Sequence, residues 1–125
     1  MIISTGIDIV EVYRIRETMT RTPRFATRVY TVGEREYCDS QGVAAHQSYA
    51  ARFAAKEAFL KAIKTGWRGK VTWHDIEILR DETGVPALKI TAEAKRLFDE
   101  LGGKYIHLSL SHTTEHAIAQ VIIEA

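Results

Sequence analysis

Cysteine and proline are scarce in this sequence, with one cysteine and two prolines among 125 residues. The lone Cys38 can form neither a disulfide within the chain nor a cysteine metal cluster, which is typical of proteins from the reducing cytoplasm. No apolar run approaches the roughly 20 residues of a membrane-spanning helix, so we expect no membrane partner. The N-terminal residues lack the basic start of a signal peptide and include Asp8 within their apolar run. These absences predict a cytoplasmic protein.

Several motifs of nucleotide and hydrolase chemistry are also missing. The chain has no phosphate-binding loop of the form Gly-x-x-x-x-Gly-Lys and no Gly-x-Gly-x-x-Gly sequence, so nucleoside triphosphate and dinucleotide binding have no support. Ser111 and His112 are neighbours, but no Gly-x-Ser-x-Gly elbow is present, and adjacency in sequence is not the geometry of a catalytic triad. The aromatic residues do not alternate with the arginines, so we expect no nucleic acid partner.

The residues that are present are typical of a folded protein, since 46% are hydrophobic and 26% are charged. The length fits one domain that covers residues 1–125. The longest pattern, from Ser48 to Lys64, is helical and rich in alanine, and its apolar residues cover nearly the whole circumference. A helix that is apolar all round is buried on most sides, so we expect it to be central and to end at Thr65-Gly66.

Shorter elements surround this helix. Thr31 and Glu34 have the spacing of a capping box, and the polar stretch 41–47 is expected to be a mobile loop. We expect an α+β fold, with mostly antiparallel strands packed around one long helix. The expected elements are strands over 2–10, 75–80, 85–90, 105–111 and 116–123, and helices over 11–19, 25–30, 31–38 and 91–101.

Two carboxylates stand among residues that are otherwise apolar. Asp8 lies inside the first strand, and Glu57 lies between Phe53 and Leu60 on the helical wheel. Burying an unpaired carboxylate is costly, so the two could converge on a divalent cation. Mg²⁺ fits better than zinc, because it takes one or two carboxylates with water and phosphate oxygens, whereas the histidines lack the spacing of a zinc site. The alternatives are a solvent-facing Asp8 and a structural ion pair from Glu57 to Lys61, four residues later.

Polar residues also mark the strand near the C-terminus. Alternation puts His107, Ser109 and Ser111 on one face of this strand, and His112 leads into a turn. Hydroxyl and imidazole groups in this arrangement suit the binding of a phosphate. Polar decoration of a strand end is the alternative.

Arginine is concentrated near the N-terminus. Residues 11–28 carry five arginines and two glutamates, a local charge of +3, whereas the rest of the chain carries −2. Such a patch on a nearly neutral protein suits an acidic partner, and an ordinary solvated helix face is the alternative.

Three of these segments together resemble one family. They are Gly6-Ile7-Asp8-Ile9, the helical stretch Arg52-Phe53-Ala54-Ala55-Lys56-Glu57-Ala58, and Ser109-Leu110-Ser111-His112. In this order and in a chain of this length, the sequence resembles the small bacterial holo-(acyl-carrier-protein) synthases of the 4′-phosphopantetheinyl transferase superfamily. The resemblance implies the fold of that superfamily. It also implies transfer of the 4′-phosphopantetheine arm of coenzyme A to a serine of apo acyl carrier protein, with release of adenosine 3′,5′-bisphosphate, in support of fatty acid biosynthesis.

The resemblance implies roles for individual residues. Asp8 and Glu57 would bind Mg²⁺ and would form the catalytic set together with Lys61. Either Glu57 or a metal-bound water would take the proton of the acceptor serine. The implied coenzyme contacts are Arg52, Lys56, Lys61, Lys64, His107, Ser111 and His112, and the implied contacts to the acidic carrier protein are Arg14, Arg21, Arg24 and Phe25.

The resemblance further implies a homotrimer with its active sites between subunits. The competing hypothesis belongs to another class of protein: a non-catalytic module that binds an acidic protein through its arginine-rich helix. In that case the carboxylates Asp8 and Glu57 would make only ion pairs.

Overall fold

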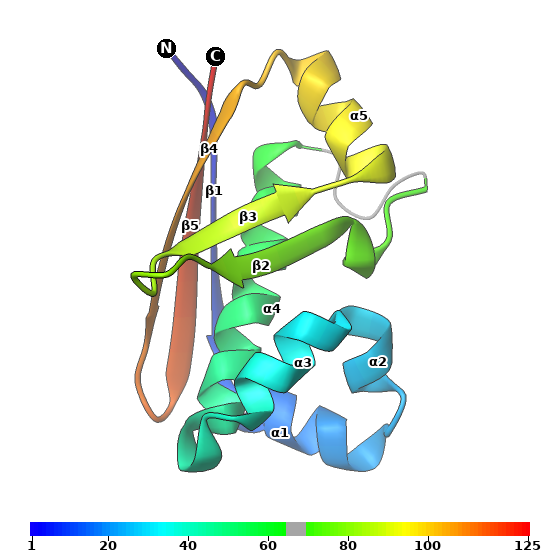
Figure 1. Cartoon of the computed structure of the whole chain (residues 1–125), viewed down its shortest axis with the longest axis vertical. Coiled ribbons are helices and arrows are strands. Elements are labelled where there is room, and N and C mark those ends of the chain that lie inside the picture. Colours follow the sequence, from blue (N-terminus) through cyan, green and yellow to red (C-terminus); the bar gives the residue numbers. More distant parts are fainter. Residues whose placement is uncertain (65–69) are drawn as a thin grey trace.

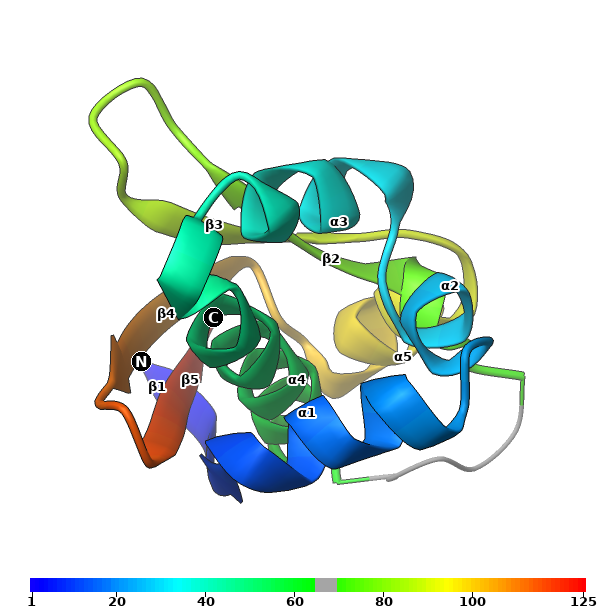
Figure 2. The same cartoon turned by 90° about the horizontal axis from the view of Figure 1, so that it is seen from below.

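A long helix, α4 (Ala45–Ala62), lies at the centre of the fold in the computed structural model of this chain, which describes residues 1–64 and 70–125. The helix has 18 residues, and most of its alanines are fully buried. Seen from one end, it is surrounded by strands and other helices (Figure 2). The expectation of a central helix is therefore confirmed. Its small alanine side chains let neighbouring elements pack closely on every side.

A three-stranded antiparallel sheet covers one side of α4 (Figure 1). Its strands lie in the order β1 (Ile2–Glu11), β5 (His116–Glu124) and β4 (Tyr105–His112), so β1 and β4 are its two edges. Alternate residues of β5 point toward α4 and are fully buried, whereas the residues between them point away. The sheet therefore has one face that is covered by α4 and one outer face.

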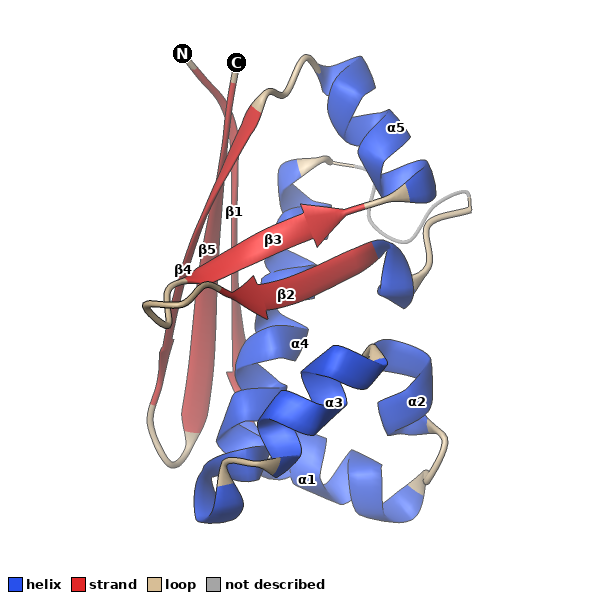
Figure 3. Cartoon of the chain, viewed as in Figure 1, coloured by secondary structure: helices blue, strands red, loops and turns tan. Residues whose placement is uncertain are grey.

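A hairpin covers another side of α4 (Figure 3). The strands β2 (Ile76–Arg80) and β3 (Pro86–Ile90) pair antiparallel as a separate sheet, and α5 (Ala92–Leu101) follows them. Gly102 ends α5 in the left-handed conformation, with a φ of 94°, as expected for a glycine after the last turn. The two antiparallel sheets and the helices around α4 confirm the expected α+β fold.

Three short helices gather at one end of α4 (Figure 1). They are α1 (Val12–Arg21), α2 (Phe25–Val29) and α3 (Val32–Asp39). The expected capping box opens α3, because the Thr31 hydroxyl accepts from the Glu34 N–H and the Glu34 carboxylate accepts from the Thr31 N–H. Since α1 follows β1 without a loop, the arginine-rich helix lies beside the end of β1 that carries Asp8.

The expected mobile loop over 41–47 is wrong. Gly42–Ala44 form a 3₁₀ turn, and α4 already begins at Ala45. This first turn of α4 is joined to β4, because Nδ1 of His112 lies 2.9 Å from the amide oxygen of Gln47. The expected stop of the helix at Thr65-Gly66 lies outside the described residues. None of the described helices combines the length and the apolar character that crossing a bilayer requires.

Candidate active site

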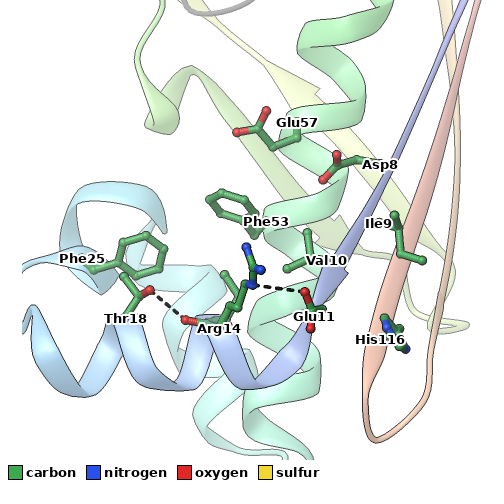
Figure 4. Close-up of a pocket in the computed structure, with 11 residues that line it drawn as sticks. Asp8, Ile9, Val10, Glu11, Arg14, Thr18, Phe25, Phe53, Glu57 and His116 are labelled. Carbon is green, nitrogen blue, oxygen red and sulfur yellow. Dashed lines mark hydrogen bonds and ion pairs between the residues drawn. The ribbon is translucent and has the colours of Figure 1, made fainter.

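A groove of about 570 Å³ opens between the end of β1, the start of α1 and the middle of α4. Figure 4 shows Asp8 and Glu57 at the same end of this groove, with Phe53 between Glu57 and Arg14. Asp8 and Glu57 are both partly buried. The structure thus brings together the two carboxylates that the sequence singles out as metal ligands.

Close packing of β1 against α4 sets the spacing between these carboxylates. At Gly6, a Cβ atom would overlap the main-chain oxygen of Ala58, so only glycine fits there. The Ser4 hydroxyl adds a short hydrogen bond to a carbonyl oxygen at the end of α4. Asp8 follows Gly6 by two residues and Glu57 directly precedes Ala58, so this contact holds the two carboxylates near each other.

Lys61 places a positive charge beside Asp8. Its ammonium donates hydrogen bonds of 2.9 Å to the Asp8 carboxylate and 3.0 Å to the Ile7 carbonyl oxygen. The Asp8 side chain is only 16% exposed, whereas the Lys61 side chain is 55% exposed. Asp8 therefore points toward α4 and not into solvent, and the ammonium reaches it from the open side.

The donor set of this groove fits a hard cation that needs few protein ligands. Mg²⁺ binds through one or two carboxylates and fills its other positions with water and substrate oxygens. Within residues 1–64 and 70–125, no group of three or more His, Cys, Asp or Glu side chains could hold a metal together, so a zinc-type site has no support there. The Lys61 ammonium at Asp8 shows that this carboxylate accommodates a cation at close range.

Comparison with known proteins agrees with this geometry. The family model of the 4′-phosphopantetheinyl transferase superfamily matches residues 4–121. The chain belongs to this superfamily. Among its relatives, the holo-[acyl-carrier-protein] synthase of Koribacter versatilis is 50% identical over 125 residues, which cover 99% of each chain. The synthase of Geobacter metallireducens is 43% identical, over 99% of this chain and 98% of its own.

Solved structures of the superfamily have the same fold. A holo-[acyl-carrier-protein] synthase from Neisseria meningitidis superposes with a TM-score of 0.89 at 34% identity, and the match covers 100% of both chains. A holo-(acyl-carrier-protein) synthase from Bacillus anthracis, solved in complex with CoA (3′,5′-ADP), gives a TM-score of 0.82 at 37% identity. That match covers 100% of this chain and 98% of the other. The resemblance identified in the sequence is confirmed.

In this phosphopantetheinyl transferase, Lys56 lies inside the protein. Its fully buried ammonium donates hydrogen bonds to the Val29 carbonyl oxygen at 2.7 Å, the Glu34 carboxylate at 2.8 Å and the Trp73 carbonyl oxygen at 3.1 Å. An ammonium has three donors, and all three are used. Burial lowers the pKa of Lys56, and the Glu34 carboxylate opposes this shift. Lys56 joins α4 to its neighbours and exposes no surface to a phosphate, in contrast to its implied role as a coenzyme contact.

Arg52 is the second implied coenzyme contact that lies inside the transferase. It is 1% exposed, and its guanidinium lies 4.2 Å from the centre of the Tyr37 ring. One of its nitrogens donates to the Ser48 hydroxyl at 3.3 Å. The other two implied cations of this region, Lys61 and Lys64, are exposed. Of the four, the structure brings only Lys61 into contact with Asp8.

The implied coenzyme contacts on β4 lie away from the groove. His107 and Ser111 are exposed on the outer face of the sheet, and Nε2 of His107 lies 2.9 Å from the Glu124 carboxylate. His112, also exposed, is the residue that contacts the first turn of α4. Because α4 covers the opposite face of the sheet, a single chain does not bring His107 and Ser111 to Asp8.

The implied contacts to a carrier protein, which we call the arginine surface, lie on α1 and at the start of α2. They are Arg14, Arg21, Arg24 and Phe25. Arg14 and Arg21 are seven residues apart on α1, a spacing that puts them on one face of the helix. Both are exposed and pair with glutamates close to them in sequence. Arg14 and Phe25 also line the groove, and Arg24 is exposed directly before α2.

The sequence patterns do not reveal the aromatic part of this site. Phe53, expected only in the core, lines the groove, and the Trp73 ring stacks on it with 5.3 Å between ring centres. His116, at the start of β5, also lines the groove. The one available signal for Phe53 is its position four residues before Glu57, which puts both on the same face of α4. Nothing in the sequence connects Trp73 or His116 with that face.

Proposed function

We propose that this chain transfers the 4′-phosphopantetheine arm of coenzyme A to a serine of an apo acyl carrier protein and releases adenosine 3′,5′-bisphosphate. The observation that carries the proposal is the groove lined by Asp8 and Glu57, with the Lys61 ammonium on Asp8. The name shared by the relatives supports the acceptor, and the coenzyme in the Bacillus anthracis structure supports the donor. The activity serves fatty acid biosynthesis in the cytoplasm.

The reaction replaces a phosphoanhydride by a phosphodiester. The serine hydroxyl oxygen forms a bond to the phosphorus of the phosphopantetheine group, and its proton leaves. The anhydride bond breaks, and its electron pair remains on the departing adenosine 3′,5′-bisphosphate. Since negative charge grows on the leaving oxygen, catalysis depends mainly on positioning and on neutralising charge.

In this proposal Asp8 and Glu57 would hold Mg²⁺, which would supply positive charge to neutralise the pyrophosphate. Lys61 would donate to a phosphate oxygen of the coenzyme. Its side chain is more than half exposed and has room for this contact. A lysine contact of this kind is a charge-assisted hydrogen bond, which is about twice as strong as a neutral one. Either Glu57 or a metal-bound water would take the proton of the acceptor serine.

A homotrimer that completes each site with a neighbouring subunit also belongs to the proposal. His107 and Ser111 face away from the groove of their own chain, so only another subunit can bring them to a coenzyme at Asp8. The same outer face carries Ile7, which is 55% exposed, and Ile118, which is 36% exposed. Packing between subunits would bury this apolar surface. Because β1 and β4 are opposite edges of the sheet, a cyclic head-to-tail arrangement can set β4 of one chain near β1 of the next.

The arginine surface is the proposed docking site of the acidic carrier protein. Arg14 and Phe25 belong both to this surface and to the groove. A carrier protein that docks there would hold its serine at the mouth of the groove. The cations Arg21 and Arg24 would steer its approach without taking part in the chemistry.

One assay separates this proposal from a non-catalytic binding module. The purified chain is incubated with apo acyl carrier protein, coenzyme A and Mg²⁺, and the carrier protein is weighed by mass spectrometry. We expect the carrier mass to rise by one phosphopantetheine group and free adenosine 3′,5′-bisphosphate to accumulate in equal amount. Chelation of the metal should stop both, and added Mg²⁺ should restore them. A chain that binds the carrier protein but never changes its mass would support the binding module.

A further inference from the structure

Arg14 and Arg21 of the arginine surface each have a carboxylate partner within the chain. Nε of Arg14 lies 3.1 Å from the Glu11 carboxylate, three residues earlier, and Figure 4 shows this pair beside the groove. Nη2 of Arg21 lies 3.8 Å from the Glu17 carboxylate, four residues earlier. A glutamate that precedes its cation by about one turn is the favourable order on a helix. We call these two contacts the internal pairs.

Both acidic residues of the arginine-rich segment serve in these pairs, since residues 11–28 contain no other glutamate and no aspartate. The side chains of Arg14 and Glu11 are 69% and 44% exposed, and those of Arg21 and Glu17 are 80% and 58% exposed. Exposed ion pairs add little to stability, because water solvates both charges and the paired side chains lose freedom. The fold therefore does not depend on these pairs, and the carboxylate of a partner can replace either glutamate.

We propose that Glu11 and Glu17 limit the affinity of the arginine surface for the acidic carrier protein, because the carrier protein must break an internal pair at each arginine. This inference rests on the proposed function. One carboxylate of the carrier protein replaces Glu11 at Arg14, and a second replaces Glu17 at Arg21. Seven residues of helix separate the two arginines by about 10 Å along the axis, so the partner needs two carboxylates at about that spacing.

The proposed reaction gives a reason to limit this affinity. The apo carrier protein and its product differ by one phosphopantetheine group on a serine, whereas the surface that docks is the same in both. Binding energy that acts equally on substrate and product lowers the KM without raising kcat, and it slows the release of product. The internal pairs weaken the docking of both forms equally, so they favour turnover.

Glu11 should have a larger effect than Glu17. Its pair has the shorter distance, and Arg14 also lines the candidate active site. Glu11 directly precedes the first turn of α1, but its side chain forms no capping hydrogen bond to the described backbone of this helix. Glu11→Gln therefore removes the charge of the pair without removing a helix cap.

The test measures binding and turnover of Glu11→Gln and Glu17→Gln. Calorimetric titration gives the Kd for the apo carrier protein, and steady-state kinetics give the KM values and the inhibition constant of the modified carrier protein. We expect Glu11→Gln to lower the Kd, the KM for the carrier protein and this inhibition constant about two- to fivefold, which is the contribution of an exposed ion pair. Glu17→Gln should act in the same direction with a smaller change. The KM for coenzyme A should stay unchanged, and kcat should not rise.

Two control variants separate the internal pairs from a simple change of net charge. Glu115→Gln removes an exposed carboxylate that lines a small pocket together with Glu11, but Glu115 forms no ion pair within residues 1–64 and 70–125. Glu93→Gln breaks a pair of the same three-residue spacing, with Arg96 on α5. Both should bind the carrier protein as the parent does. In an Arg14→Gln background, Glu11→Gln should have no effect, because a double-mutant cycle isolates the contribution of the pair.

Several results would overturn the inference. If Glu115→Gln raised the affinity as much as Glu11→Gln, or if Glu11→Gln acted equally with and without Arg14, only net charge would matter. A loss of affinity in Glu11→Gln would mean that Glu11 holds Arg14 in its docking position, and unchanged affinity in both variants would mean that the pairs have no role. A parent chain that binds the carrier protein but never modifies it would refute the proposed function alone. A parent chain that does not bind it would refute both.

Discussion

At the scale of single residues, Asp8 and Glu57 carry the negative charge that the proposed chemistry needs. Asp8→Asn and Glu57→Gln keep the size of each side chain and remove its charge. We expect each change to lower kcat/KM at least about 100-fold, because preorganised charge at a reacting phosphate is worth that much or more. Isothermal titration with Mg²⁺ and coenzyme A should show weakened metal binding, while the circular dichroism spectrum stays that of the parent.

The control for these variants is Glu100→Gln, which removes an exposed carboxylate from α5. It should leave activity and metal binding unchanged. Near-normal activity of Glu57→Gln would contradict the metal assignment and favour a structural ion pair at this position.

Lys61 and Lys56 lie five residues apart on the same helix and should respond differently to replacement. Lys61→Ala should weaken coenzyme A binding about 10- to 100-fold, the loss of one charge-assisted hydrogen bond, and leave the KM for the carrier protein unchanged. Lys56→Ala should lower the free energy of unfolding by about 3–5 kcal/mol, because it leaves the Glu34 carboxylate buried without its partner. Calorimetric binding and urea unfolding of both variants measure the two effects. If Lys56→Ala kept the stability of the parent but weakened coenzyme binding, Lys56 would be a coenzyme contact and not a structural residue.

The same two lysines show which roles of single residues can be predicted from the sequence. The resemblance implies a coenzyme contact for both. Lys61 contacts Asp8, which is 53 residues away in the chain. Lys56 instead contacts the buried Glu34, which is 22 residues away. Sequence spacing identifies partners one helical turn apart and gives no information about partners across the fold. The outward or inward direction of a lysine on a helix that is buried all round therefore could not be predicted.

At the scale of elements, most expectations are confirmed, because each rests on a local pattern. Alternation in β1, β4 and β5 gives their lengths to within one or two residues, and Thr31 with Glu34 correctly marks the start of α3. The sequence predicts too late a start for α4, because His46 and Gln47 are polar, although both belong to its first turn. The division of the strands into two sheets follows from packing around α4, which no local pattern describes.

The arginine-rich helix α1 provides a prediction at this scale. Arg14→Glu should raise the KM for the acidic carrier protein and leave the KM for coenzyme A unchanged, because exposed charges set the rate of encounter more than the chemistry. The effect should shrink as salt rises, since the screening length at physiological ionic strength is about 8 Å. Steady-state kinetics at two salt concentrations measure this dependence.

Lys95→Glu is the matched charge reversal for this measurement. Lys95 is an exposed cation on α5, at the other end of the molecule from α1 (Figure 1). It should alter neither KM. If the KM for the carrier protein changed neither with Arg14→Glu nor with the salt concentration, the arginine surface would be an ordinary solvated face.

At the scale of the whole molecule, the outer face of the sheet decides whether sites are shared between chains. Asp8→Asn and Ser111→Ala should each be strongly impaired alone, because one loses the carboxylate and the other the proposed coenzyme contact from the neighbour. Mixed and allowed to exchange subunits, they should recover about a quarter of the parent activity, since that share of sites would pair two unaltered halves in a cyclic assembly. Activity that stays at the level of the separate variants would mean that each chain holds a complete site.

Ile7→Arg tests the same assembly by mass. A charge at the centre of the apolar outer face should shift the protein toward the monomer in analytical ultracentrifugation and lower activity in parallel. Leu79→Arg is the control, because Leu79 is an exposed apolar residue on the other sheet. If Ile7→Arg kept the assembly mass and the activity of the parent, the outer face of the sheet would not be part of the interface.

The contact between Gly6 and Ala58 has a consequence for the mechanical behaviour of the molecule. Strand and helix already touch there, backbone against backbone, so this contact contains no free volume that could be squeezed out. Close-packed regions of a protein are its least compressible parts, and open cavities yield first. Under hydrostatic pressure the distance between Asp8 and Glu57 should therefore stay constant. The two carboxylates are anchored to a contact that pressure can hardly shorten.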